Sequence, residues 1–138
     1  MKISLIVPCY NEEKNVSCFF EACKNAFFGK TDSYEIIFIN DGSKDNTWNE
    51  LKKLHNLYGE KIKLINFSRN FGKESAMYAG FCHAEGDYVT VIDADLQQRP
   101  EIAWEMVDFL DNHEEYDCVA AFQEKRNEGK FLSFCKKC

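Results

Sequence analysis

Residues 88–100 read YVTVIDADLQQRP, an apolar run that ends abruptly in charge. The β-branched residues from Val89 to Ile92 predict a buried strand. The strand stops at two carboxylates one residue apart, Asp93 and Asp95. If the chain turns there, both carboxylates face one point outside the sheet edge. Such hard oxygen ligands suit Mg²⁺ or Mn²⁺ and leave positions free for substrate phosphate. Gln97 could add a neutral oxygen to this predicted metal site.

The alternative is a purely structural role, in which Asp93 and Asp95 form a turn and a helix cap ahead of Pro100. For an isolated Asp-x-Asp pair that interpretation would be preferred. The ends of the other predicted strands carry polar residues as well, and this favours a metal site over a simple turn.

The chain has 138 residues, of which 45% are hydrophobic and 29% charged. These values are ordinary for a globular protein, and the length predicts one domain over residues 1–138. The formal charge of -6 argues against a nucleic-acid partner, because such proteins normally carry a basic patch. An anionic ligand would therefore need a metal.

Seven cysteines lie mostly in apolar segments, and no signal peptide precedes the first apolar run. An odd number of cysteines without a secretory context predicts reduced thiols and a cytoplasmic protein. Cys135 and Cys138 have the spacing of half a zinc site, but no second pair matches it, so we interpret them as a chance pair. No run reaches the length of a transmembrane helix, and the chain as given is expected to be soluble.

Apolar runs alternate with helix-length segments along the chain. The runs begin at Ile3, Glu35, Lys61, Tyr88 and Asp117, and the helical segments are 12–28, 45–58, 71–84 and 99–113. This alternation indicates βαβ units with right-handed crossovers. It predicts an α/β, doubly wound fold with a mostly parallel sheet that is covered on both faces.

Polar residues follow each of the first four predicted strands. The segments are PCYNEE (8–13), NDGS (40–43), SRNFGK (68–73) and DAD (93–95). Each one alone would be interpreted as a capped turn. Because ligands bind at the carboxyl ends of open parallel sheets, we expect the four strand ends to face one crevice.

Two familiar phosphate-binding motifs are missing from the sequence. No G-x-G-x-x-G follows the first strand, and no G-x-x-x-x-G-K-[ST] is present. Without a glycine cradle, the charge of a diphosphate must be neutralised in another way. A metal at Asp93 and Asp95, together with Arg69 or Lys73, could neutralise this charge.

These segments together resemble the ordered motifs of family two glycosyltransferases, which have the GT-A nucleotide-sugar fold. The resemblance covers nearly the whole chain, and SRNFGKE with DADLQ is similar to the polyprenyl-phosphate branch, the dolichyl-phosphate mannose synthases and bactoprenol glycosyltransferases. The motifs are VPCYNEE (7–13), NDGSKDNT (40–47), SRNFGKESA (68–76) and DADLQQRPE (93–101).

The resemblance implies roles for individual residues. Asp95 would bind the divalent metal, Mg²⁺ or Mn²⁺, directly. Asp93 would contact ribose or metal, and Gln97 matches a further metal-side position. Arg69 and Lys73 are candidates for the donor phosphate. The residues implied in donor-nucleotide binding are Pro8, Tyr10, Glu12, Asp41, Asp93, Ala94 and Asp95. No catalytic residue is assigned beyond Asp95, which would act through the metal.

The sequence departs from the family pattern after the fifth predicted strand. The family usually has Gly-x-Arg there, with the arginine near the donor diphosphate, whereas this chain has Ala121, Phe122 and Gln123. Arg126 lies three residues further on and could substitute as a donor-phosphate residue. The chain also ends where relatives continue, so we expect it to be truncated and to correspond to the N-terminal half of the domain.

The resemblance implies a metal-dependent, inverting enzyme that moves a sugar from a UDP-sugar or GDP-mannose to a polyprenyl phosphate. The intact protein would work at the cytoplasmic face of the membrane and would meet the membrane only through the missing C-terminal part. Two alternatives stay open, a hydroxyl acceptor in polysaccharide or cell-wall synthesis and a non-catalytic nucleotide-sugar-binding module. The missing half would also leave an apolar surface that a second copy could cover, giving a homodimer.

Overall fold

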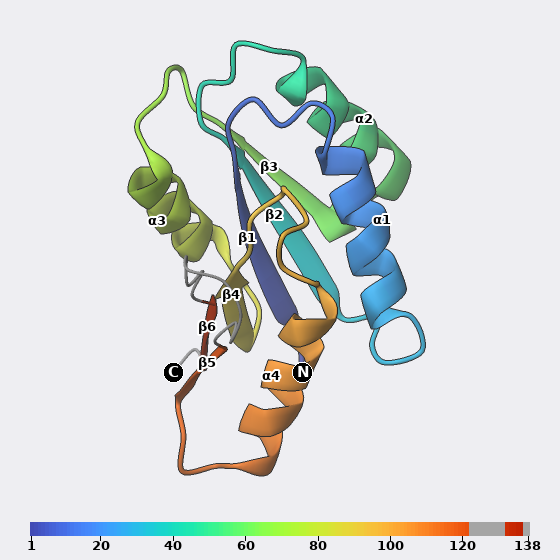
Figure 1. Cartoon of the computed structure of the whole chain (residues 1–138), viewed down its shortest axis with the longest axis vertical. Coiled ribbons are helices and arrows are strands. Elements are labelled where there is room, and N and C mark those ends of the chain that lie inside the picture. The colour runs from blue at the N-terminus through green and yellow to red at the C-terminus, as the bar shows by residue number, and fades with distance from the viewer. Residues whose placement is uncertain (122–131, 137–138) are drawn as a thin grey trace.

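The computed structural model describes residues 1–121 and 132–136 of the chain. Within these residues, six strands form one sheet in the order β3-β2-β1-β4-β6-β5 (Figure 1). The pairs β1–β2, β1–β4 and β2–β3 are parallel, as the strand-helix alternation predicted. The strands are β1 Ile3–Cys9, β2 Tyr34–Asn40, β3 Ile62–Asn66, β4 Tyr88–Val91, β5 Cys118–Ala121 and β6 Leu132–Lys136.

Helices cover both faces of the sheet, which confirms the doubly wound α/β prediction. Residues of α1, α2 and α4 share one buried cluster, whereas α3 belongs to a second cluster on the other face (Figure 1). The helices are α1 Val16–Phe27, α2 Thr47–Tyr58, α3 Lys73–His83 and α4 Glu101–Asn112, and the short 3-10 helix η1 Gly59–Lys61 precedes β3.

Alternate residues of each central strand supply the two cores. In β1, Leu5 and Val7 belong to the larger cluster with Phe38, and Ile6 belongs to the smaller one with Ile37. Successive side chains of a strand point to opposite faces, so a strand buried on both faces needs apolar residues at nearly every position. This requirement explains why the strands appear in the sequence as continuous apolar runs.

Helix α3 packs closely on its face because small residues lie at the contact. Ala76 and Gly80 are its buried residues. A Cβ added at Gly80 would run into the side chain of Ile6 in β1. The close fit fixes the height of α3 above the sheet, and with it the position of Lys73, the first residue of the helix.

The sixth strand was not predicted. β6 pairs antiparallel with β4 on one side and with β5 on the other, so the fifth predicted strand is not a neighbour of β4. An antiparallel strand that enters between two others needs no crossover helix of its own. The alternation of strands and helices along the sequence therefore gives no sign of it.

Predicted helix starts were wrong by a few residues. The first helix was expected from Glu12 but begins at Val16, and the third was expected from Phe71 but begins at Lys73. Residues before these two helices form hydrogen bonds to other segments of the chain instead. The backbone N–H of Glu12, for example, donates to the hydroxyl of Thr47 at 2.8 Å.

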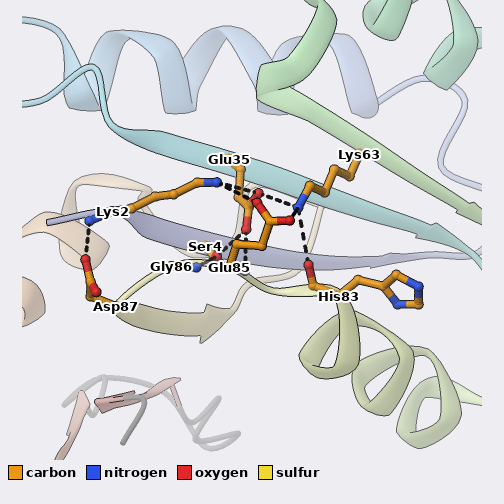
Figure 2. A network of polar contacts seen from close by, with 8 residues as sticks. All are labelled: Lys2, Ser4, Glu35, Lys63, His83, Glu85, Gly86 and Asp87. Atoms are coloured by element: carbon orange, nitrogen blue, oxygen red, sulfur yellow. Dashed lines mark hydrogen bonds and ion pairs between the residues drawn. The ribbon is translucent and has the colours of Figure 1, made fainter.

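A charged network closes the amino ends of the strands (Figure 2). Its centre is Glu35 in β2, which is 1% exposed. Glu35 Oε2 lies 3.1 Å from Lys2 Nζ and 2.9 Å from Lys63 Nζ. Glu35 Oε1 accepts hydrogen bonds from the Ser4 hydroxyl at 2.6 Å and the Glu85 backbone N–H at 2.8 Å. The network joins β1, β2, β3 and the segment before β4.

The partners of Glu35 determine its charge state. Burial by itself would raise the pKa of this carboxyl, but the hydrogen bonds from Ser4 and Glu85 and the two lysines outweigh burial. They lower the pKa of Glu35 to about 2. Glu35 is therefore ionised at neutral pH, as a buried carboxylate must be when it is paired and hydrogen-bonded.

Candidate active site

A crevice of about 260 Å³ opens at the carboxyl ends of the strands. Its lining comes from the last residues of β1, the segments after β1, β2 and β4, and the first residue of α3. Most of the residues that the sequence singled out meet there. The lining residues are Pro8, Cys9, Tyr10, Glu12, Asp41, Lys73, Asp93, Ala94 and Asp95.

A larger hollow of about 800 Å³ lies at the opposite, amino end of the strands. Its walls include the Glu35 network, in which Lys2 and Lys63 each pair with Glu35 and Glu85. Because these charges satisfy one another, we assign them a structural role. The carboxyl ends of parallel strands are also where ligands bind in open α/β sheets, so the smaller crevice is the candidate site.

The segment after β1 is tied to the segment after β2 by backbone and side-chain hydrogen bonds. The Asn11 backbone N–H donates to the Ser43 hydroxyl at 3.0 Å, and the Lys44 N–H donates to Asn11 Oδ1 at 2.8 Å. Asn11 has φ 54, a left-handed conformation that Asn tolerates better than most residues. These bonds fix the backbone that presents Tyr10 and Glu12 to the crevice.

Asp41 joins the segment after β2 to the segment after β3. Its side chain is 4% exposed. Oδ1 accepts the Phe71 N–H at 2.8 Å, and Oδ2 accepts the Gly72 N–H at 3.1 Å and the Asn70 side-chain amide at 3.2 Å. A carboxylate that accepts three N–H groups holds them more strongly than a neutral acceptor would. The β3–α3 loop is therefore held in place by one carboxylate.

Gly42 brings these two loops into contact. Its φ is +67, and an added Cβ would collide with backbone atoms of Arg69 and Asn70. A glycine is required here both for the left-handed backbone and for the close approach. The NDGS motif thus has a packing reason in addition to the carboxylate of Asp41.

The segment after β4 carries the Asp-x-Asp pair into the crevice. Asp95 Oδ1 accepts the backbone N–H of Gln97 at 3.2 Å. Leu96, between Asp95 and Gln97, has φ 61, which is unusual for a residue with a bulky side chain. Asp93 Oδ1 lies 2.7 Å from Lys73 Nζ, so the third helix contacts the Asp-x-Asp segment through an ion pair.

Negative charge dominates the crevice. Its described lining includes four carboxylates, those of Glu12, Asp41, Asp93 and Asp95, and one cation, Lys73. The pKa of the Cys9 thiol is raised mainly by burial. The negative charges of Glu12 and Asp93 raise it further. Such a surplus of carboxylates would disfavour a nucleoside diphosphate that enters without an added cation.

Asp93 and Asp95 fit a divalent cation. Both are hard oxygen donors, they are one residue apart, and both line the crevice. Within the described part of the chain, no group of three or more His, Cys, Asp or Glu side chains is arranged to hold a metal ion. The two carboxylates would therefore supply part of a coordination shell and leave the rest to a ligand's phosphate oxygens.

Two predicted site residues, Gln97 and Arg69, lie away from the crevice lining, and a third cannot be placed. Gln97 is exposed and is not among the residues that line the crevice. Arg69 is exposed too, and its guanidinium stacks 4.2 Å from the ring centre of Phe71. Arg126 lies outside the described residues. Their proposed contacts with metal or donor phosphate stay predictions.

Sequence reasoning missed several residues that build the crevice. Cys9 lines it, and Ser43 and Thr47 hold its loops through the contacts described above. The hydroxyl and amide residues of NDGSKDNT and SRNFGK were the available signal. Nothing in the sequence shows which of them bond across loops.

None of the helices in the described ranges, 1–121 and 132–136, has both the length and the hydropathy of a membrane span.

Two curated relatives were compared with the chain over most of its length. Uncharacterized glycosyltransferase YkcC of Bacillus subtilis (strain 168) is 39% identical over 132 residues, which cover 96% of this chain and 40% of that protein. Bactoprenol glucosyl transferase of Shigella phage SfV is 44% identical over 102 residues, which cover 74% of this chain and 33% of that protein. The chain thus spans less than half the length of either relative.

The solved structure of S. aureus TarS 1-349 has the same fold. It matches with a TM-score of 0.75 and 26% identity, covering 94% of this chain and 39% of TarS 1-349. Its complex with UDP matches with a TM-score of 0.70 and 28% identity, covering 86% of this chain and 34% of the TarS chain. The glycosyl transferase family 2 model matches residues 4–135. The chain therefore belongs to glycosyl transferase family 2.

Proposed function

We propose that this chain forms the nucleotide-sugar-binding part of a metal-dependent, inverting glycosyltransferase. The sugar passes from a nucleoside-diphosphate sugar to a polyprenyl phosphate. The observation that carries the proposal is the crevice itself, where the Asp93–Asp95 pair and the residues after β1 and β2 face one space. Family membership makes sugar transfer the expected chemistry.

The donor side of the proposal rests on the charge and shape of the crevice. Pro8, Tyr10, Glu12, Asp41 and Ala94 line the crevice, and we assign the first four to contacts with the base and ribose. Asp41 already accepts three N–H groups, but Oδ1 accepts only one of them and retains a lone pair for the nucleotide. TarS, which shares the fold, was solved with UDP. A UDP-sugar is therefore the first donor to test, with GDP-mannose as the alternative.

A divalent metal, Mg²⁺ or Mn²⁺, would be held by Asp93 and Asp95. When bound, it would supply Lewis-acid stabilisation of the negative charge that grows on the leaving diphosphate. Lys73 would add a second positive charge from the wall of the crevice. Arg69, which is not in the lining, and Arg126, which is outside the described residues, are the remaining donor-phosphate candidates.

The acceptor side rests on the relatives. Bactoprenol glucosyl transferase of Shigella phage SfV is named for a polyprenyl acceptor. A lipid phosphate is largely ionised near neutral pH, since the second pKa of a phosphate monoester is about 6. Such a nucleophile needs little general-base help, and in-line attack opposite the diphosphate inverts the anomeric centre. We place this reaction at the cytoplasmic face of a membrane, where lipid phosphate and nucleotide sugar can meet.

Product analysis tests the acceptor and the stereochemistry together. The protein is incubated with radiolabelled UDP-glucose or GDP-mannose, Mn²⁺, and either a short polyprenyl phosphate or a glucose-terminated oligosaccharide. We expect label in the lipid phosphate, metal dependence, and inverted anomeric configuration by NMR. Transfer to the sugar hydroxyl alone would replace this proposal by polysaccharide synthesis. Donor binding without transfer to either acceptor would indicate a binding module.

A further inference from the structure

We propose that Lys73 is a tethered cation that occupies Asp93 when no divalent metal is bound. Metal and lysine then compete for one carboxylate, and the donor diphosphate relieves the competition by attracting the lysine. This inference rests on the proposed function, because it assumes that metal and diphosphate enter the crevice. Its consequence is that this chain binds metal weakly until the nucleotide arrives.

The geometry places the lysine where a metal ligand is needed. Lys73 Nζ lies 2.7 Å from Asp93 Oδ1, and the two side chains are 56% and 25% exposed. Asp93 is one of the two carboxylates that fit a divalent cation. A cation that binds Asp93 must displace the ammonium group or approach it closely, and two like charges at that distance repel each other.

The backbone that carries Lys73 is held on both sides. Before it, the N–H groups of Phe71 and Gly72 donate to the carboxylate of Asp41 at 2.8 and 3.1 Å. After it, Ala76 and Gly80 pack α3 against the sheet. The ammonium group therefore moves by side-chain rotation about a fixed Cα, which allows exchange between two partners inside one crevice.

The charge balance gives the lysine two alternative partners. In the described lining it is the one cation beside four carboxylates, so Asp93 is its partner when no ligand is present. A bound nucleoside diphosphate would bring a strong competing anion into the same space. When Lys73 turns to the diphosphate, Asp93 becomes available to the metal. By linkage, each ligand then raises the affinity for the other by the same factor.

The expected effect is modest, because an ion pair with an exposed lysine is weak. Removing the lysine should tighten metal binding in the absence of nucleotide by roughly 1.5- to fivefold. In the presence of nucleotide the gain should shrink or reverse, because the lysine then contacts phosphate. A lysine with only a structural role at the start of α3 would leave metal affinity unchanged.

The test measures Mn²⁺ affinity directly, from the EPR signal of free Mn²⁺, with and without saturating UDP or GDP. Wild type is compared with Lys73→Met and Lys73→Gln, which remove the charge, and with Lys73→Arg, which keeps it. Lys53→Met is the matched control, because Lys53 forms a similar ion pair at 2.9 Å with Glu50 on α2, outside the crevice. Circular dichroism checks that each variant is folded.

We expect Lys73→Met and Lys73→Gln to bind Mn²⁺ more tightly without nucleotide and to show less coupling between metal and nucleotide. Lys73→Arg, which keeps the charge, should bind Mn²⁺ no more tightly than wild type, and Lys53→Met should behave like wild type. Unchanged or weaker Mn²⁺ affinity in both neutral variants would overturn the inference even if Mn²⁺ and nucleotide bind wild type together. Failure of wild type to bind nucleotide with Mn²⁺ would instead overturn the proposed function, and the inference with it.

Discussion

The carboxylate of Asp41 accepts the backbone N–H of Phe71 at 2.8 Å, across 30 residues of sequence. This bond and its neighbours make the β2–α2 and β3–α3 loops one unit. Lys73 follows that unit directly, so the position of the cation in the crevice depends on a carboxylate in a different loop. The proposed donor contact of Asp41 would therefore be coupled to the structure of the β3–α3 loop.

Asp41→Asn should destabilise the protein by about 1–3 kcal/mol. An amide offers one acceptor oxygen where the carboxylate offers two, and its own N–H₂ group would face the donors of the β3–α3 loop. Denaturant unfolding measures the loss. Asp32→Asn is the control, because Asp32 is exposed and outside the crevice. Equal stability of the two variants would show that Asp41 does not hold the loop.

Gly42→Ala should be clearly more destabilising than Gly29→Ala. Both glycines have left-handed backbones, with φ +67 and +74, so both variants carry the same conformational strain of roughly 1–2 kcal/mol. Only at Gly42 does the added Cβ meet backbone, whereas at Gly29 nothing lies within 4 Å. The difference in the free energy of unfolding between the variants isolates the contact of the two loops. Equal losses would contradict that contact.

Glu35→Gln should cost about 3 kcal/mol at pH 7, because the folded state lowers the pKa of Glu35 from 4.5 to about 2. A carboxyl with a lowered folded pKa stabilises the protein above its unfolded pKa. The stabilisation is lost as pH falls from about 4.5 through about 2. The stability difference between wild type and Glu35→Gln should therefore shrink over that window.

Denaturant unfolding at pH 7, 4.5 and 3 measures the stability difference at Glu35. Glu85→Gln is the matched control, since Glu85 pairs with the same two lysines but its side chain is 67% exposed. Its effect should be within about 1 kcal/mol. A pH-independent difference for Glu35→Gln would show that the carboxylate charge does not contribute to stability.

The sequence predicted the fold class and most of the crevice for the same physical reason. Strands buried on both faces must be apolar throughout, so the first polar residues after them mark the sheet edge. Asp41, Asp93 and Asp95 were found in this way, as were Tyr10 and Glu12. Their convergence follows from parallel strands that all end on one side.

Other features depend on contacts between distant segments and left no local signal. Arg69 stacks on the Phe71 ring, and its motif alone did not give the direction of its side chain. Glu35 stood at the start of an apolar run, and its pairing with Lys2 and Lys63 depends on how β2 aligns with the segments that carry the two lysines. β6 was missed because it enters the sheet without a crossover helix.

Calorimetric titration with UDP and GDP, with and without Mn²⁺, tests the central claim most directly. It is performed on wild type, Asp95→Asn and Asp108→Asn, the last an exposed control on α4. The account predicts nucleotide binding that requires Mn²⁺, that is lost in Asp95→Asn and that is retained in Asp108→Asn. Nucleotide binding of equal strength in the absence of metal, or in Asp95→Asn, would contradict a metal site at the end of β4.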